Sequence, residues 1–175
     1  MELNELIKDC AHRQKKGLHF ILTSIIIWAM ICGVHLTDMT IMQKNIITFC
    51  CSAILLPMAW MLSKVLKIDF EGKGNPLTKA GILFSINQML YILIVMWVYA
   101  AVPEKMVMVY AMVFGAHLMP FSWLYASKSY MVFSIVVPIL SLIVGLLYPP
   151  SVLAALMSVI EATFSFCLYQ ECKKL

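Results

Sequence analysis

Glu161 is the residue of this 175-residue chain whose position points most directly to chemistry. It lies midway along an apolar run from Ser151 to Gln170, and a helical rise of about 1.5 Å per residue places it about 15 Å from either end. If the run crosses a bilayer, a charged side chain at this depth costs about 2.5–3.5 kcal/mol. We therefore expect Glu161 to face the interior of a helix bundle, where its carboxyl group finds a partner or takes up a proton.

His117 is the candidate partner of Glu161, because a second apolar run places its imidazole at nearly the same depth. A third run carries Asn87, Gln88 and Tyr91 around that level, and a spacing of four residues puts Asn87 and Tyr91 on one helix face. We expect these five side chains to form a central cluster that binds a proton, a small polar ligand, or both. The alternative is structural: hydrogen bonds of about 0.6 kcal/mol each would select helix partners, with nothing bound.

The sequence offers no motif for catalysis, for a metal or for a cofactor, and we expect none of the three. His35 and Asp38 could share a helix face, but two ligands do not make a metal site. The six Cys contain no Cys-x-x-Cys pair and are expected to be small apolar core residues. No nucleophile motif accompanies His117 and Glu161, which weakens the hypothesis of an acid–base enzyme.

The composition indicates which elements must position these residues. Of the residues, 62% are apolar and 13% are charged, whereas a soluble domain has about 25% charged residues. This excludes a soluble enzyme and a disordered chain. The net charge of +4 comes from scattered Lys and Arg rather than from a basic face, so no nucleic-acid partner is expected. The remaining class is a multi-span membrane protein whose partner is the lipid bilayer.

Six apolar runs are long enough to cross about 30 Å of hydrocarbon as helices. They predict an all-α fold, a polytopic membrane protein with a six-transmembrane-helix bundle that forms a single membrane domain over residues 1–175. Residues 1–16 are expected to be a cytoplasmic or interfacial leader, and residues 171–175 a cytoplasmic tail. The expected spans are approximately 17–36, 45–66, 80–102, 106–126, 130–148 and 151–170.

The two halves of the chain share a pattern that suggests an internal repeat. Gly33-Val34-His35-Leu36 in the first run resembles Gly115-Ala116-His117-Leu118 in the fourth. Pro57 and Pro138 correspond in the second and fifth runs, where each frees a helical carbonyl group. With three spans per half, the duplication would be an inverted 3+3 repeat. Against this hypothesis, His35 lies near the end of its span and His117 in the middle.

Several segments together carry a resemblance to a known family. They are Leu6-Ile7-Lys8-Asp9, Lys15-Lys16-Gly17, Asn75-Pro76-Leu77-Thr78, Asn87-Gln88-Met89-Leu90-Tyr91 and Gly115-Ala116-His117-Leu118. Over nearly its whole length the chain resembles a family of small uncharacterised bacterial integral membrane proteins with six predicted spans and no assigned activity. The resemblance implies a bacterial plasma (inner) membrane location and transfers no catalytic or binding residue.

Three functions fit these features. The first is a transporter or proton-linked permease for a small solute, in which Glu161 titrates, His117 tunes it, and the polar groups of the third span contact the cargo. The second is a non-catalytic membrane sensor, immunity factor or assembly protein. The third is an intramembrane enzyme in which His117 and Glu161 act as an acid–base pair on a lipid. A homodimer is a further hypothesis, because two copies of a small six-span protein could enclose a cavity.

The distribution of basic residues predicts that both termini are cytoplasmic, since Lys and Arg near span ends stay on that side. A reporter that is active only outside the cytoplasm, fused after Lys174, is therefore expected to be inactive; an active fusion would overturn the orientation. Of the 13 Lys and Arg, only Lys44 and Lys105 fall on the far side. The others are Lys8, Arg13, Lys15, Lys16, Lys64, Lys67, Lys73, Lys79, Lys128, Lys173 and Lys174.

Overall fold

A computed structural model describes residues 2–70, 72 and 74–175, and over these ranges the chain contains helices and no strands. The all-α, six-span prediction is confirmed. Lys73, counted above among the basic residues, lies outside the described residues. Six helical segments are long and apolar enough to cross a membrane: Lys15–His35, Ile41–Val65, Leu77–Ala101, Pro103–Leu124, Lys128–Leu147 and Pro150–Cys172. The chain is thus a multi-pass membrane protein.

Some spans consist of more than one helix. The first is a short 3₁₀ turn, η1 (Lys15–Gly17), followed by α2 (Leu18–His35), and the second is divided into α3 (Ile41–Ala53) and α4 (Leu55–Val65). The third is α5 (Leu77–Ala101). The fourth comprises η2 (Pro103–Lys105), α6 (Met106–His117) and α7 (Met119–Leu124). The last two are α8 (Lys128–Leu147) and α9 (Pro150–Cys172), and α1 (Leu3–Arg13) precedes them all.

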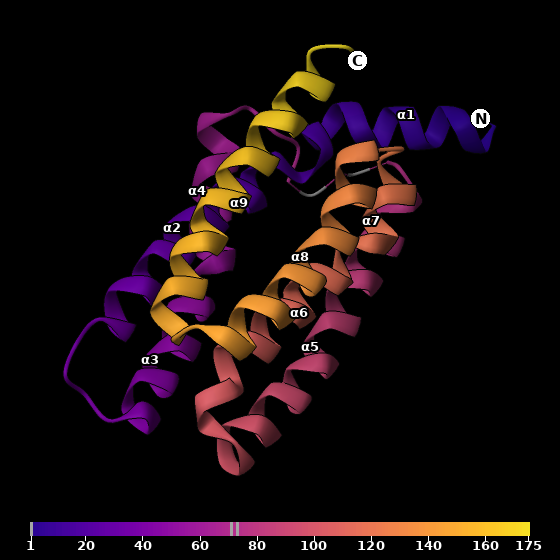
Figure 1. Ribbon diagram of the computed structural model, residues 1–175. Helices are drawn as coiled ribbons and strands as arrows, with labels where there is room; N and C mark the ends of the chain where they lie inside the picture. Colours follow the sequence, from indigo (N-terminus) through magenta and orange to yellow (C-terminus); the bar gives the residue numbers. More distant parts are fainter. Residues whose placement is uncertain (1, 71, 73) are drawn as a thin grey trace.

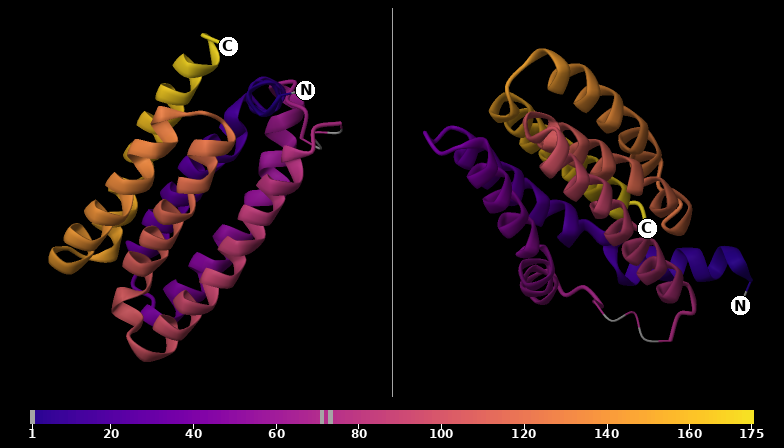
Figure 2. Two further views of the ribbon diagram at one scale, coloured as in Figure 1. Left: turned by 90° about the vertical axis from the view of Figure 1, so that its right-hand side faces the viewer. Right: turned by 90° about the horizontal axis from the view of Figure 1, so that it is seen from below.

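The spans pack as two groups of three (Figures 1 and 2). In one group α2 lies between α9 and the α3–α4 span, and in the other α6 lies between α5 and α8. Each group therefore takes its third member from the other half of the sequence. This exchange is compatible with an inverted 3+3 repeat, which stays a prediction.

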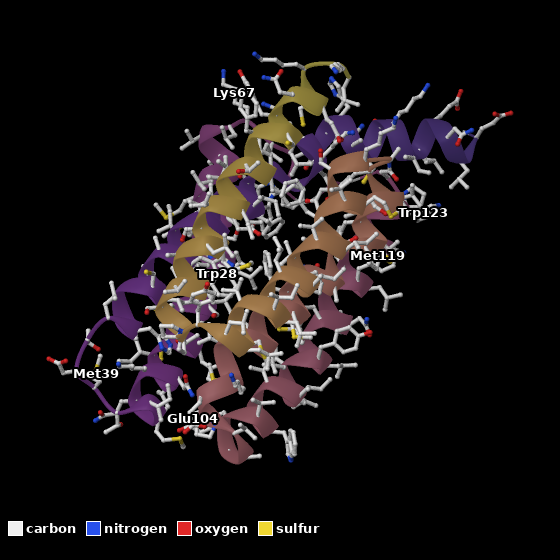
Figure 3. All side chains as sticks on the ribbon, viewed as in Figure 1. Trp28, Met39, Lys67, Glu104, Met119 and Trp123 are labelled. Carbon is white, nitrogen blue, oxygen red and sulfur yellow. The ribbon has the colours of Figure 1, made fainter. Side chains whose placement is uncertain are left out.

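Both chain termini lie at one end of the bundle, which we call the terminal face (Figure 1). Lys67 also lies at this end, whereas Met39 and Glu104 lie at the opposite end (Figure 3). The helix α1 crosses the terminal face and extends sideways from the bundle (Figures 1 and 2). An odd number of crossings cannot return both ends to one side, so this placement agrees with an even number of spans.

The second span begins at Ile41, earlier than expected, because Thr40 caps it. The Thr40 hydroxyl accepts from the Gln43 backbone, and the Gln43 side chain accepts from the Thr40 backbone. The backbone N–H groups of Thr40 and Gln43, which have no acceptor within the helix, are hydrogen-bonded in this way.

Prolines interrupt the second and fourth spans. Pro57 cannot donate to the carbonyl of Ala53, and α3 ends there; Pro120 cannot donate to Ala116, and α6 ends at His117. Pro138, in contrast, lies within α8, which stays one continuous helix. The two interruptions, centred on Ile54 and Leu118, divide each span into two shorter helices.

The leader helix α1 is fastened to the bundle. Its apolar face is buried, including Cys10, whose thiol pKa is raised to about 11 by burial and, to a smaller extent, by the charge of Asp9. The side-chain amide of Asn75 donates to the carbonyl of Leu6 and to the carboxylate of Asp9, each at 2.8 Å. The backbone N–H of Asp69 donates to the backbone carbonyl of Arg13. The loop between the second and third spans therefore holds α1 in place.

A left-handed turn connects α1 to the first span. Lys15, Lys16 and Gly17 have φ values of 43°, 50° and 70°, a conformation that residues with a Cβ rarely adopt. At Gly17 an added Cβ would lie 3.0 Å from the Tyr130 hydroxyl oxygen, so a side chain would be strained there and glycine is favoured. The Tyr130 hydroxyl also donates to the carbonyl of Lys16 at 2.9 Å, which stabilises the turn.

The carboxylate of Glu171 joins three distant segments, in an arrangement that we call the Glu171 clasp. It accepts from Lys16 Nζ at 2.8 Å, from the Ser127 hydroxyl at 2.7 Å, and from the Ser129 hydroxyl and backbone at 2.7 and 2.9 Å. The Lys16 side chain is only 7% exposed. The clasp thus links the start of the first span, the start of the fifth and the end of the sixth.

Glu171→Gln is expected to lower the free energy of unfolding by about 3 kcal/mol, because it leaves the Lys16 ammonium buried without a counter-ion. Thermal unfolding in detergent would show this as a lower midpoint. Glu104→Gln, which removes an exposed carboxylate at the other end of the bundle, serves as the matched control and is expected to change little. Equal midpoints for both variants would show that the clasp contributes no stability.

Candidate functional site

A central cavity of about 270 Å³ lies between the two groups of spans. Its walls come from η1 and α2, from the α3–α4 span, from α5, from the α6–α7 span and from the start of α8. Most of the lining is apolar, which is usual for small-molecule sites in which a few polar groups set the orientation of the ligand. The polar side chains in the lining are Ser52, Ser85, Gln88, His117, Tyr125 and Tyr130.

Both helix interruptions border this cavity. Ala53 and Leu55 flank the break at Ile54, while His117 and Leu118 form the break between α6 and α7, and all four line the cavity. Irregular backbone at membrane depth is tolerated where it is buried in protein or lines a cavity. The cavity therefore lies where two spans lose their regular helical hydrogen bonding.

The ring of His117 is held by its own helix. Its Nδ1 donates to the carbonyl of Phe114, and the ring packs edge-on between Phe114 and Phe121, with centroid distances of 5.3 and 6.0 Å. With Nδ1 as the donor, Nε2 of the neutral ring is left as a hydrogen-bond acceptor. His117 can therefore accept one hydrogen bond from a ligand in the cavity.

The polar residues expected on one level of the third span lie on two different faces of α5. Gln88 is half-buried and lines the cavity, whereas Asn87 and Tyr91 are on the exposed face of α5. There the Asn87 amide donates to the Tyr91 hydroxyl at 2.9 Å. The structure thus brings Gln88 to the same cavity as His117 and places the Asn87–Tyr91 pair on the outer surface.

Glu161 lies elsewhere, in the interface between α9 and α2, and is fully buried. Its Oε2 is 2.6 Å from the hydroxyl oxygen of Ser24, which is also 2.7 Å from the carbonyl oxygen of Ile21. A serine hydroxyl has one hydrogen, so it can donate to only one of these oxygens. Both contacts become hydrogen bonds if Glu161 is a neutral carboxylic acid that donates to Ser24 while Ser24 donates to Ile21. The structure gives His117 and Glu161 separate partners.

Other buried polar atoms near α2 and α9 have no hydrogen-bond partner within the described ranges. They are Oε1 of Glu161, the hydroxyl of Ser165 and both ring nitrogens of His19. The His19 ring instead packs against Phe20 and Phe70, with centroid distances of 4.2 and 5.5 Å. Of these atoms, Glu161 Oε1 and the Ser165 hydroxyl belong to α9 side chains that lie against α2.

Two contacts in this interface were missed by reasoning from the sequence, namely Ser24 with Glu161 and Lys16 with Glu171. A register signal could have found them. Lys16 and Ser24 are eight residues apart on the first span, and Glu161 and Glu171 are ten residues apart on the sixth. If the two spans are antiparallel, this spacing places Lys16 beside Glu171 and Ser24 beside Glu161.

Comparison with known proteins gives a family but no activity. Residues 3–171 match a family described as "Family of unknown function (DUF7010)". No curated protein and no solved structure matches the chain.

The hydrogen-bond geometry predicts that Glu161 is protonated at neutral pH. The infrared spectrum of the purified protein is expected to contain a carboxylic-acid carbonyl band that Glu161→Gln removes and that Glu104→Gln leaves in place. The glutamine amide can still donate to Ser24, so Glu161→Gln is expected to fold normally. A spectrum in which Glu161→Gln removes only carboxylate bands would contradict the neutral acid.

Proposed function

We propose that this chain, which belongs to the Family of unknown function (DUF7010), is a transporter that carries a small amphiphilic solute through its central cavity. One observation carries the proposal: two interrupted spans meet at one cavity, where Gln88 and His117 offer hydrogen bonds. In many transporters the substrate lies near the bilayer midplane between discontinuous helices. The expected site residues Gln88 and His117 are the ligand contacts in this proposal.

The cavity supports a ligand that is small and mostly apolar. A volume of about 270 Å³ is at the lower end for ligand sites, and an apolar wall favours a hydrocarbon or aromatic body. Gln88 can donate and accept hydrogen bonds, and Nε2 of His117 can accept one. The matching solute has one apolar part and one polar group.

The exposure of the lining residues indicates how a solute enters. Leu56 on α4 and Met89 on α5 line the cavity and are nevertheless 61% and 54% exposed. The helix α4 packs mainly on α2 rather than on α5, so the cavity opens sideways between α4 and α5. The opening faces the hydrocarbon of the bilayer, and a solute dissolved there reaches the cavity directly.

The two interruptions supply hinges for alternating access. Beyond Ile54 and Leu118, the short helices α4 and α7 continue toward the terminal face, while α3 and α6 lead to the other side. Hinge residues are commonly at the ends of elements, where a few backbone torsions absorb the change. Movement of α4 and α7 about these two points would open the cavity to one side of the membrane at a time.

Glu161 can couple proton exchange to solute transport through its contact with α2, without touching the solute itself. Ser24 bridges Glu161 and the carbonyl of Ile21, and the side chain of Ile21 lines the cavity. When Glu161 loses its proton, Ser24 must donate to the carboxylate and release Ile21. Proton exchange at Glu161 therefore changes the hydrogen bonding of a cavity wall.

The setting of the proposal is a bacterial inner membrane with both termini cytoplasmic. A homodimer through α5 fits this arrangement, because α5 is the most exposed span and carries the Asn87–Tyr91 pair on its outer face. A polar pair at membrane depth favours a helix partner over lipid.

Flux measurements in proteoliposomes test the transport proposal. Benzamidinium and benzenesulfonate are suitable probes, because both are small aromatic amphiphiles whose rings partition into the bilayer while their charges, of opposite sign, keep them from crossing it unaided. The amidinium can donate hydrogen bonds to Gln88 and His117, and the sulfonate can accept one from Gln88. We expect protein-dependent uptake of one of them, and Gln88→Leu is expected to lower it about fivefold through the loss of one hydrogen bond of about 1 kcal/mol.

The matched control is Asn87→Leu, the same change one residue away on the outer face of α5, which is expected to leave uptake unchanged. Glu161→Gln is expected to abolish the dependence of uptake on an imposed pH gradient. Absence of protein-dependent uptake for both probes, or equal losses in Gln88→Leu and Asn87→Leu, would refute the proposed cavity site.

A further inference from the structure

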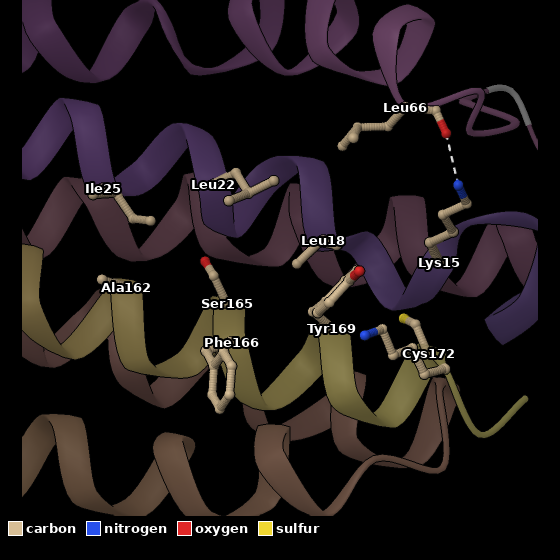
Figure 4. A pocket seen from close by; sticks show the side chains of 11 residues that line it. Lys15, Leu18, Leu22, Ile25, Leu66, Ala162, Ser165, Phe166, Tyr169 and Cys172 are labelled. Carbon is tan, nitrogen blue, oxygen red and sulfur yellow. Dashed lines mark hydrogen bonds between the residues drawn. The ribbon is translucent and has the colours of Figure 1, made fainter.

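A second hollow, separate from the central cavity, lies between α2 and α9 on the outside of the bundle (Figure 4). Its volume is about 600 Å³. We call it the α2–α9 groove. Its polar end is formed by Lys15, Tyr169 and Lys173, which belong to the start of the first span and the end of α9, at the terminal face. Its apolar end is formed by Ile25 and Ala162 (Figure 4). None of these residues lines the central cavity.

Two ammonium groups stand at the polar end without an acidic partner. Lys15 Nζ donates to the carbonyl of Leu66 at 2.7 Å, and Lys173 Nζ lies 4.5 Å from the centroid of the Tyr169 ring. Neither forms an ion pair with a carboxylate among the described residues, whereas neighbouring Lys16 is paired with Glu171. The mouth of the groove therefore carries uncompensated positive charge.

Apart from the Ser165 hydroxyl, the groove beyond its polar end is mostly apolar, and it has the length of one bilayer leaflet. Leu18, Leu22 and Ile25 form one wall, and Ala162 and Phe166 contribute to the other (Figure 4). From Lys15 to Ile25 the helical rise gives about 15 Å, half of the roughly 30 Å of bilayer hydrocarbon. An extended acyl chain that begins at the lysines would end near Ile25.

A buried hydroxyl in the groove also points to an occupant. Ser165 is 5% exposed, its side chain is directed from α9 toward α2, and its oxygen has no hydrogen-bond partner among the described residues (Figure 4). A buried hydroxyl without a partner costs about 1–3 kcal/mol. An ester oxygen of a lipid drawn into the groove would satisfy it.

We propose that the α2–α9 groove is a specific site for an anionic phospholipid. One acyl chain lies along the apolar walls, and the phosphate lies between Lys15 and Lys173. The charge of the mouth selects an anionic headgroup over a zwitterionic one, and each Lys near an anionic membrane surface adds attraction. The site is independent of the solute site, because it uses other residues, which lie on a different face of α2.

Lipid binding to the purified full chain tests this proposal. Native mass spectrometry is used to compare phosphatidylglycerol with phosphatidylcholine of identical acyl chains. Phosphatidylglycerol is expected to bind at least about tenfold more tightly, and the double variant Lys15→Gln/Lys173→Gln is expected to remove that preference. The matched control is Lys8→Gln/Lys174→Gln, which removes two exposed lysines that do not line the groove, and it is expected to keep the preference.

A second pair of variants tests the groove itself. Ala162→Phe fills the groove and is expected to reduce binding of both lipids, whereas Thr163→Phe places the same ring on the adjacent lipid-facing side of α9 and is expected to have no effect. Ala162 is exposed in the groove wall, so the variant should fold. Equal binding of the two lipids to the wild-type protein, or unchanged binding in Ala162→Phe, would overturn the proposed site.

Discussion

The arrangement of the bundle depends on how the first and last spans satisfy two carboxyl groups. Glu161 and Glu171 lie on α9, and both meet polar groups of the first span, Ser24 and Lys16. A polar side chain at membrane depth must find a partner inside the protein, because the hydrocarbon offers none. The two contacts are separated by similar lengths of helix, so together they fix the register and the antiparallel direction of this pair.

The pair α2–α9 belongs to the first group of spans, and the second group, made of α5, the α6–α7 span and α8, packs against that group. The central cavity lies where the two groups meet. The proline-broken spans lie at this boundary. Both interruptions are short, since Ile54 and Leu118 keep helical torsion angles and their backbone N–H groups bond to Cys51 and Gly115. The α2–α9 pair with its clasp has the polar contacts that link distant segments, whereas the boundary between the groups holds the cavity and the interrupted helices. This division suits the transport function proposed above, in which a fixed frame supports moving segments.

The sequence predicts the spans well because hydrocarbon thickness sets their length and apolar runs are long and separate. It also predicts that Glu161 is buried, since the cost of a carboxyl at that depth is large. It does not predict the partner of Glu161, because serine hydroxyls are tolerated in any span and the pairing of the first with the last span is a tertiary property. The sequence also does not predict which face of α5 is turned toward the bundle. Asn87 and Gln88 are adjacent, yet Asn87 is exposed and Gln88 lines the cavity.

The effect of Pro57, Pro120 and Pro138 shows the same limit. All three remove a helical donor, but only the first two coincide with a break, whereas α8 continues past Pro138 although the carbonyl of Ser134 loses its usual donor. Local chemistry therefore marks where a helix can break, and the surrounding bundle decides whether it does.

The pairing of α2 with α9 also has a consequence for biosynthesis. The ribosome delivers α2 first and α9 last, so the Lys16 ammonium and the Ser24 hydroxyl enter the membrane long before their acidic partners exist. Until translation ends, these two groups need temporary hydrogen-bond partners, which water, lipid headgroups or the insertion machinery can supply. A nascent chain that stops before the final span therefore gives an incomplete bundle in which α2 still packs on α3 and α4, but Lys16 and Ser24 lack their acidic partners. We expect membrane quality control to recognise such a product.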